Sequence, residues 1–328
     1  ILQEESFGKG GEGSLKKTLG TFSKEYSAVI AILVMGVFFS LMSPYFLTGQ
    51  NLKNILLQCA ALAIVASGQA LIVISGNLDL SLGQCVCFSS VIGAYLMRFV
   101  GVNPWVAIFC ALIVGCMVGL CNGLLVAYIG LPAFIATLGT QMVCQSFSKI
   151  ITNATPIARL PKEIAFLGRG YLGPIPICVL IMLAIYAVVQ FVSTKTRLGR
   201  NIFAIGGGSE AAYFAGIPTK RYLCITYVIG GLLAAVGGVL LMSRLDSVSI
   251  SNGSQYEFDS LIACVISGLS TTGGKGRVVG VLFGTIFLIM FFNGMTMMDV
   301  EPFYQNAIKG AVLIIAITAD VLRNKKKN

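Results

Sequence analysis

The sequence predicts an all-α integral membrane protein with about ten transmembrane helices, one or two of which are broken or half-length. Of its 328 residues, 56% are hydrophobic and only 11% are charged, whereas a soluble domain carries about 25% charged residues. The apolar residues form runs of the length that a helix needs to cross a bilayer, which is about 20 residues. Helix is the expected conformation because lipid satisfies no backbone hydrogen-bonding group.

Ten apolar runs account for the predicted helices. They cover residues 27–47, 55–75, 83–100, 105–128, 133–151, 175–193, 222–243, 258–270, 278–298 and 303–322. The run at 258–270 is too short to cross a membrane alone, so we expect a broken or half helix that is buried by protein. The tetrapeptide VISG occurs at 73–76 and at 265–268, each time before a polar stretch that contains glycine. The repetition hints at two related halves, each with an interrupted helix.

The basic residues predict which side of the membrane each connection faces. Cytoplasmic connections carry an excess of Lys and Arg. If the N-terminus is cytoplasmic and all ten runs cross, fifteen basic residues lie inside and seven outside, with Lys309 inside the last run. We therefore predict a cytoplasmic N-terminal tail at 1–26, a single transmembrane domain at 27–322 and a basic cytoplasmic tail at 323–328.

Several classes of chemistry find no support in the sequence. Histidine is absent, which excludes proton relays and metal sites built on that residue. The ten cysteines lie in apolar stretches without a paired CxxC pattern, so we interpret them as thiols that face lipid or the core. No acid–base pair or activated nucleophile stands out, and no catalytic residue, cofactor or metal is expected in this chain. The net charge of +10 reflects topology rather than binding of nucleic acid.

Asp79 is the only charged residue between Ile55 and Leu96. A carboxylate in apolar surroundings is costly unless it is paired, capped or solvated. The preceding Ser-Gly-Asn at 75–77 suits the end of one helix, and Asp79 or Ser81 suits the start of the next. We favour this capping role; the alternatives are a direct role in a transport pathway and coupling to protons.

The longest well-charged internal stretch, residues 194–221, is predicted to face the cytoplasm. Within it, Ser209 is expected to cap a short helix that has Glu210 in its first turn. Gly216 is expected to end this helix, which leaves aromatic residues exposed on a surface loop. We interpret the loop as a docking element for a partner protein, and the alternative is an idle surface turn.

Four stretches carry a resemblance to a known family. EAAYFAG at 210–216 resembles the coupling loop of bacterial ATP-binding-cassette (ABC) importer permeases. The other stretches resemble permeases of the ribose/galactose/xylose type, within the branched-chain-amino-acid/sugar permease superfamily, and occur in family order. They are NLKNILLQ followed by SGNLDLSLG at 51–83, LPAFIATLGT at 131–140 and STTGGKGRVVGVLFG at 270–284. The likeness covers about residues 45–322. Asn77 departs from it, because many relatives have a second glycine there, and the I-x-L-P that follows the loop in many other importers is absent.

The resemblance implies the permease subunit of an importer that moves a monosaccharide across the bacterial cytoplasmic membrane by alternating access. Its implied partners are an ATP-binding subunit that holds ATP and Mg, an extracytoplasmic solute-binding protein, a second permease copy and the lipid bilayer. Coupling to the ATPase would involve Glu210, Ala211, Ala212, Tyr213, Phe214 and Gly216. The alternatives are a permease for nucleosides, autoinducer-type sugars or branched-chain amino acids, and an ion-coupled secondary transporter. The scarcity of charge within the apolar runs weighs against the last.

Polar residues within or beside the apolar runs are the candidates for lining a sugar pathway. They are Gln69, Asn77, Asp79, Asn122, Gln141 and Asn293. Uncharged donors and acceptors suit a sugar, although such residues more often join helices to one another. The glycine-rich stretch at 267–280 is not expected to bind nucleotide, because Lys275 is followed by Gly276 rather than by Ser or Thr.

Overall fold

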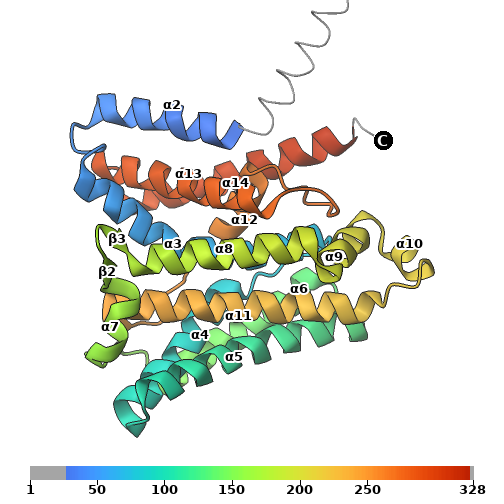
Figure 1. The fold of residues 1–328 in the computed structure, drawn as a ribbon, viewed down its shortest axis with the longest axis horizontal. Helices are drawn as coiled ribbons and strands as arrows, with labels where there is room; N and C mark the ends of the chain where they lie inside the picture. The colour runs from blue at the N-terminus through green and yellow to red at the C-terminus, as the bar shows by residue number, and fades with distance from the viewer. Residues whose placement is uncertain (1–26, 326–328) are drawn as a thin grey trace, which may run out of the picture.

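The computed structural model describes residues 27–325 as a cluster of roughly aligned helices (Figure 1). The predicted tail at 1–26 and the last three residues of the predicted tail at 323–328 lie outside the described residues. The long helices are α2 (Ser27–Met42), α3 (Gly49–Ile74), α4 (Leu82–Tyr95), α5 (Pro104–Leu124), α6 (Ala133–Thr152), α8 (Ile177–Lys195), α11 (Thr219–Leu245), α13 (Val278–Met297) and α14 (Pro302–Lys325). Helices α4 and α5 each continue into one π-helical turn, at Leu96–Val100 and Leu125–Ile129.

Shorter elements lie at the two ends of this cluster or inside it. The short helices are α7 (Lys162–Arg169), α9 (Arg197–Gly207), α10 (Ser209–Phe214) and α12 (Tyr256–Ile266). Two small antiparallel sheets pair β1 (Ile157–Ala158) with β4 (Ser247–Val248) and β2 (Tyr171–Leu172) with β3 (Ile175–Pro176). Neither the two sheets nor helices α7 and α9 were predicted from the sequence.

The predicted class of an all-α, multi-pass membrane protein is confirmed. Among the described residues, seven helices are long and apolar enough to cross a membrane: α3, α4 and α5 with their π-helical turns, α8, α11, α13 and α14. Each of the ten predicted runs contains one helix, but the number that crosses stays a prediction. Helix α12 has 11 residues, as expected for the short run at 258–270.

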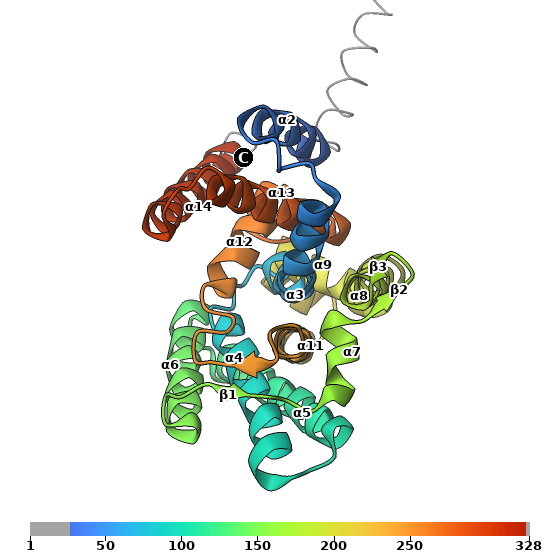
Figure 2. The same cartoon turned by 90° about the vertical axis from the view of Figure 1, so that its left-hand side faces the viewer.

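Helix α3 is the central helix of the cluster. Every residue from Cys59 to Ile74 is buried, and α3 packs against α8, α11, α12 and α13 (Figure 2). Its middle is rich in alanine and contains Gly68, and small residues let membrane helices approach closely. At Gly68 a Cβ atom would lie only 3.1 Å from the Cα atom of Gly230 in α11. The core is therefore built by close backbone contact as well as by large side chains.

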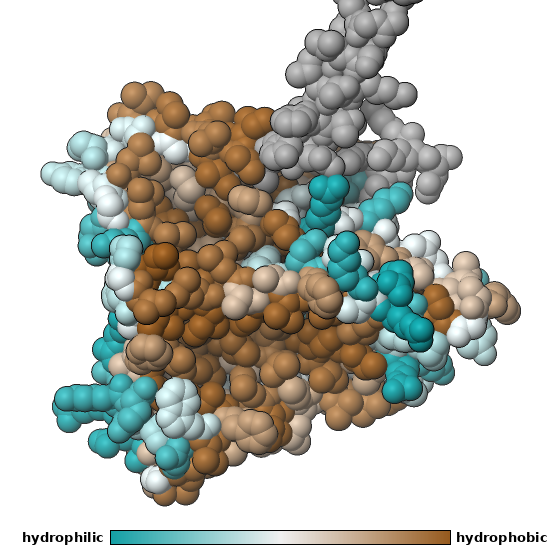
Figure 3. Space-filling view, in the orientation of Figure 1, coloured by the Kyte–Doolittle hydropathy of each residue, from teal (hydrophilic) through white to brown (hydrophobic). Residues whose placement is uncertain are grey.

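The two ends of the described chain lie at one end of the molecule. The start of α2 and the end of α14 are on the same side as α9 and α10, whereas α7, β2 and β3 lie at the opposite end (Figure 1). In the space-filling view, a broad apolar band separates two polar ends (Figure 3). This is the surface expected of a protein whose middle contacts lipid.

The arrangement of the helices predicts on which side of the membrane the C-terminus and the turn between β2 and β3 lie. A reporter enzyme that is active only outside the cytoplasm will be inactive when fused after Asn328 and active when inserted at Gly173, between β2 and β3. The reason is that the basic connections, which stay in the cytoplasm, cluster at the α10 end. An active fusion after Asn328 would contradict the predicted topology.

Candidate functional site: the coupling loop and the polar residues of the helix cluster

The predicted coupling loop, 194–221, folds into two consecutive helices, α9 and α10. Thr196 is the N-cap of α9, and its side-chain oxygen accepts the N–H of Gly199 at 3.3 Å. The N-cap of α10 is Gly208, and the helix begins without a side-chain cap. The prediction that Ser209 caps this helix was therefore wrong: Ser209 is its first residue, because Gly208 follows α9 directly and occupies the cap position.

The end of α10 is where the sequence predicted it. Gly216 has a φ angle of +82°, a conformation that glycine adopts without a steric penalty. Its N–H donates to the Tyr213 carbonyl oxygen at 2.9 Å, and the N–H of Ile217 donates to the Ala212 carbonyl oxygen at 3.1 Å. These bonds close the helix in the manner of a glycine C-cap.

The aromatic residues of α10 face away from the protein. Tyr213 and Phe214 are 66% and 86% exposed, and their ring centroids lie 5.9 Å apart. Ala212 is buried against the molecule, and Glu210 is exposed in the first turn. Exposed aromatic residues on a protruding element are the residue types that dominate many protein interfaces.

Asp79 lies in the connection between α3 and α4 and is almost completely buried. Its Oδ1 atom accepts the backbone N–H of Ser81 at 2.8 Å and the Ser81 hydroxyl at 2.6 Å. The Nδ2 atom of Asn122, from α5, donates to Ser81 Oγ at 2.8 Å and to Asp79 Oδ2 at 3.2 Å. The carboxylate therefore joins the interruption to a neighbouring helix.

This network differs from the predicted cap. Ser81 is the N-cap of α4 but its side chain makes no capping bond, because its hydroxyl hydrogen bonds to Asp79 instead. Asp79 binds the N–H of the N-cap residue itself rather than one inside the helix. The predicted position at a helix start is confirmed; the predicted hydrogen-bond pattern was wrong. The Asn122 contact spans 43 positions in the chain and has no local sequence signal.

The other candidate residues are spread over the molecule. Asn293 exchanges two hydrogen bonds with Asn51, at 2.8 and 3.1 Å, and Asn77 donates to the Ser75 carbonyl oxygen at 3.3 Å. Gln141 donates to Glu257 at 3.3 Å. The side-chain amide of Gln69 is fully buried and has no hydrogen-bond partner among the described residues.

Two buried carboxylates that were not predicted as site residues, Glu257 and Asp259, lie on α12. Asp259 forms an ion pair with Lys309 of α14, with 3.0 Å between Oδ1 and Nζ. The Nζ atom also lies 4.6 Å from the centre of the Phe292 ring. Glu257, two residues earlier, accepts the bond from Gln141. Lys309 stood out in the last apolar run, but its partner is 50 positions away, so sequence spacing could not reveal it.

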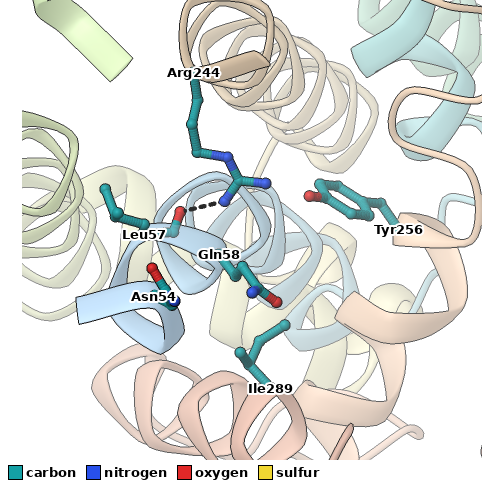
Figure 4. A pocket seen from close by; sticks show the side chains of 6 residues that line it. All are labelled: Asn54, Leu57, Gln58, Arg244, Tyr256 and Ile289. Carbon is teal, nitrogen blue, oxygen red and sulfur yellow. Dashed lines mark hydrogen bonds between the residues drawn. The ribbon is translucent and has the colours of Figure 1, made fainter. Parts of the chain in front are cut away.

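A cavity of about 370 Å³ lies between α3, α11, α12 and α13. It is lined by Asn54, Leu57, Gln58, Arg244, Tyr256 and Ile289 (Figure 4). The Arg244 guanidinium donates to the Leu57 carbonyl oxygen at 2.7 Å. Arg244 is in the last turn of α11, so the cavity is near the end of the molecule opposite α10.

The fold is that of a multi-pass membrane protein with a short helix, α10, that carries two exposed aromatic residues at one end of the molecule (Figure 1). Residues 51–317 match the family described as the permease component of the branched-chain amino acid transport system. The chain belongs to this family of transport permeases.

The curated relatives match over nearly their full length. The chain is 35% identical to the ribose import permease protein RbsC of Escherichia coli K12, over 92% of this chain and 94% of the relative. It is 34% identical to the galactose/methyl galactoside import permease protein MglC of the same strain, over 95% and 98%. It is 33% identical to the probable ABC transporter permease protein YphD, also of that strain, over 96% and 95%. No solved structure matches the chain.

The Asp79 network predicts different effects for two substitutions. Asp79→Asn will keep most of the stability, because Asn can still accept from Ser81. After the Asn122 amide turns over, the new amide group can donate to the Oδ1 atom of Asn122, and this bond replaces those that Asn122 Nδ2 gives to Asp79 and Ser81. Asp79→Leu will cost about 1–3 kcal/mol, because it leaves buried polar groups unpaired. Thermal unfolding of the two purified variants measures the difference, and equal loss of stability would contradict the network.

Proposed function

We propose that this chain is the permease subunit of an ABC importer that carries a monosaccharide across the bacterial cytoplasmic membrane. The observation that carries the proposal is α10, a short helix with two exposed aromatic residues in the loop that resembles the family's coupling loop. Membership of the permease family and the similarity to the ribose and galactose import permeases support it.

The proposed mechanism couples α10 to ATP. An ATP-binding subunit on the cytoplasmic side holds ATP and Mg, and Tyr213 and Phe214 of α10 insert into a groove on it. Glu210 stabilises the start of the helix, because a negative charge there faces the positive end of the helix dipole. Closure of the ATP-binding subunits on ATP then moves α10, and the pathway through the permease closes on one side of the membrane and opens on the other.

The proposed topology has ten crossings, a permease domain at 27–322 and both termini in the cytoplasm. The apolar band between two polar ends in Figure 3 supports the membrane-spanning part of this topology. The end that carries α7, β2 and β3 then faces outward and receives the solute-binding protein. A second permease copy, identical or closely related, completes the complex. Helix α14 supports this, because it is apolar enough to cross a membrane yet its apolar window has no buried residue.

The candidate pathway residues fall into two groups, according to whether their side chains already have hydrogen-bond partners within the chain. Asn293 and Asn122 join helices within the chain, as polar residues in membranes often do. We propose that Gln69 meets the sugar during transport, because its buried amide is unpaired. Gln141 remains a second candidate beside Glu257. A permease for nucleosides or branched-chain amino acids is the alternative function, and the family description favours the latter.

The docking role of α10 predicts the effect of two substitutions. Phe214→Asp and Gly216→Val will leave the chain in the membrane but abolish ATP-dependent uptake, and the ATP-binding subunit will no longer co-purify. The first places a charge in an apolar contact, and the second forces a β-branched residue to a φ angle of +82°. Immunoblots of membranes, pull-downs and uptake of labelled ribose and galactose measure the three effects.

Gly216→Asn is the matched control for this experiment. Asn adopts positive φ angles more readily than other non-glycine residues, and no atom lies within 4 Å of a Cβ at Gly216. We expect this variant to keep both the partner and uptake. Full uptake by Phe214→Asp would contradict the docking role.

Gln69 provides a separate prediction about the pathway. Gln69→Met will fold normally, because Met has a similar volume and removes an unpaired buried amide. Sugar uptake will fall about two- to tenfold, since a neutral hydrogen bond contributes about 0.5–1.5 kcal/mol. Thr226→Val is the control: Thr226 is buried, and its hydroxyl donates to the Tyr222 carbonyl oxygen one turn earlier in the same helix, at 2.8 Å. Unchanged uptake by Gln69→Met would remove Gln69 from the pathway.

A further inference from the structure

Two helix interruptions in this chain have the same geometry. The two VISG copies, at 73–76 and 265–268, end α3 and α12. Their glycines have φ angles of +81° and +85°. In each copy the glycine N–H donates to the carbonyl oxygen of the valine three residues earlier, at 2.9 Å. The sequence echo therefore corresponds to one repeated helix end.

The connections that follow these two helix ends meet each other. The first connection joins α3 to α4, and the second, residues 267–277, joins α12 to α13. The backbone N–H of Gly274 donates to the Ile74 carbonyl oxygen at 2.9 Å. A Cβ atom at Gly273 would lie 2.7 Å from the Cα atom of Gly76. The two interruptions thus share a hydrogen bond and a backbone contact without intervening side chains.

The C-terminal end of α9 also packs against the two connections where they meet. A Cβ atom at Gly206 would lie 2.5 Å from the backbone nitrogen of Gly274 and would overlap the Ile74 carbonyl oxygen. One turn earlier, the buried side chain of Ile202 belongs to the same apolar cluster as Ile74 and Leu269. Helix α9 is therefore packed against both connections, through backbone at Gly206 and through a side chain at Ile202.

The same helix carries the coupling element. Only Gly208 separates α9 from α10, and the Gly208 carbonyl oxygen accepts the N–H of Ala212 at 2.9 Å. The second connection is also fixed to α14, because the N–H and hydroxyl of Thr271 both donate to Asp320 Oδ2, at 2.8 and 2.7 Å. Close contacts therefore join α9, which adjoins α10, to both connections, and hydrogen bonds join the second connection to α14.

We propose that Gly206, Gly273 and Gly274 are positioning residues that form a rigid glycine junction, through which α10 moves the α3–α4 and α12–α13 connections together. The inference rests on the proposed function. In this proposal the glycine-rich stretch after α12 has a mechanical role. Its glycines allow the backbones of the two connections and of α9 to touch. Interfaces packed this tightly shift between discrete arrangements rather than deforming gradually.

Two matched pairs of variants test the junction. Gly206→Ala inserts a methyl group into the contact, whereas Gly207→Ala adds one where nothing lies within 4 Å. Gly273→Asn and Gly268→Asn both place Asn, which tolerates positive φ, at φ angles of +85°. At Gly273 the new Cβ meets the backbone of Gly76 and Gly206, whereas at Gly268 it meets no atom within 4 Å.

The experiment uses the complete complex of permease, ATP-binding subunit and solute-binding protein, with whichever of labelled ribose, galactose or xylose the wild type imports. We expect Gly206→Ala and Gly273→Asn to retain the ATP-binding subunit. Their uptake, and the stimulation of ATPase activity by the sugar-loaded binding protein, will fall about tenfold or more, as loss of a typical coupling between sites requires. Both controls will match the wild type.

Three results for Gly206→Ala and Gly273→Asn would overturn the junction. The first is wild-type uptake by both variants. The second is loss of the ATP-binding subunit, which would indicate a docking defect, and the third is absence of the variants from the membrane, which would indicate a role in folding alone. Failure of the proposed function is a different result: the wild-type complex would then import none of the sugars, whatever the variants do.

Discussion

The constraint on which this structure depends is that backbone groups inside a membrane must find partners within the protein. Regular helices satisfy it by themselves, but the interruptions after Ile74 and Ile266 do not. In the first interruption the Ile74 carbonyl oxygen is satisfied by Gly274, from the second one. The polar groups at the start of α4 are satisfied by Asp79 and Asn122. The buried carboxylate and the paired glycine-rich connections thus both supply hydrogen-bond partners to backbone groups at helix interruptions.

This constraint links the architecture to the proposed transport cycle. The two interruptions hydrogen bond to each other, and in our proposal they therefore move together. Helix α9 touches both through Gly206, so in our proposal a displacement of the adjoining α10 reaches both interruptions through one helix. The same close packing recurs along α3 and α11, where Gly68 lies against Gly230. A core held together by backbone contacts of this kind favours rigid movement of helix groups over local deformation.

The sequence predicted the helices well because their apolar runs are long and are separated by polar stretches. It also predicted the left-handed end at Gly216, since glycine after an aromatic, alanine-rich helix is a strong local signal. It placed the cap of α10 at Ser209 rather than Gly208, because adjacent helices leave no room for an ordinary cap. The contacts of Asp79 with Asn122 and of Asp259 with Lys309 join residues about 40 to 50 positions apart. No sequence periodicity encodes such pairs. The contacts around Gly206 likewise join segments that are distant in the sequence, so the sequence could not predict them.

The most direct test of this account is transport by purified components in liposomes. The chain would be reconstituted with its ATP-binding subunit and solute-binding protein, and uptake of labelled sugar measured with and without ATP. The account predicts uptake that requires ATP and both partners. Sugar uptake by the chain alone, driven by an ion gradient with no ATP-binding subunit present, would contradict it and identify a secondary transporter instead.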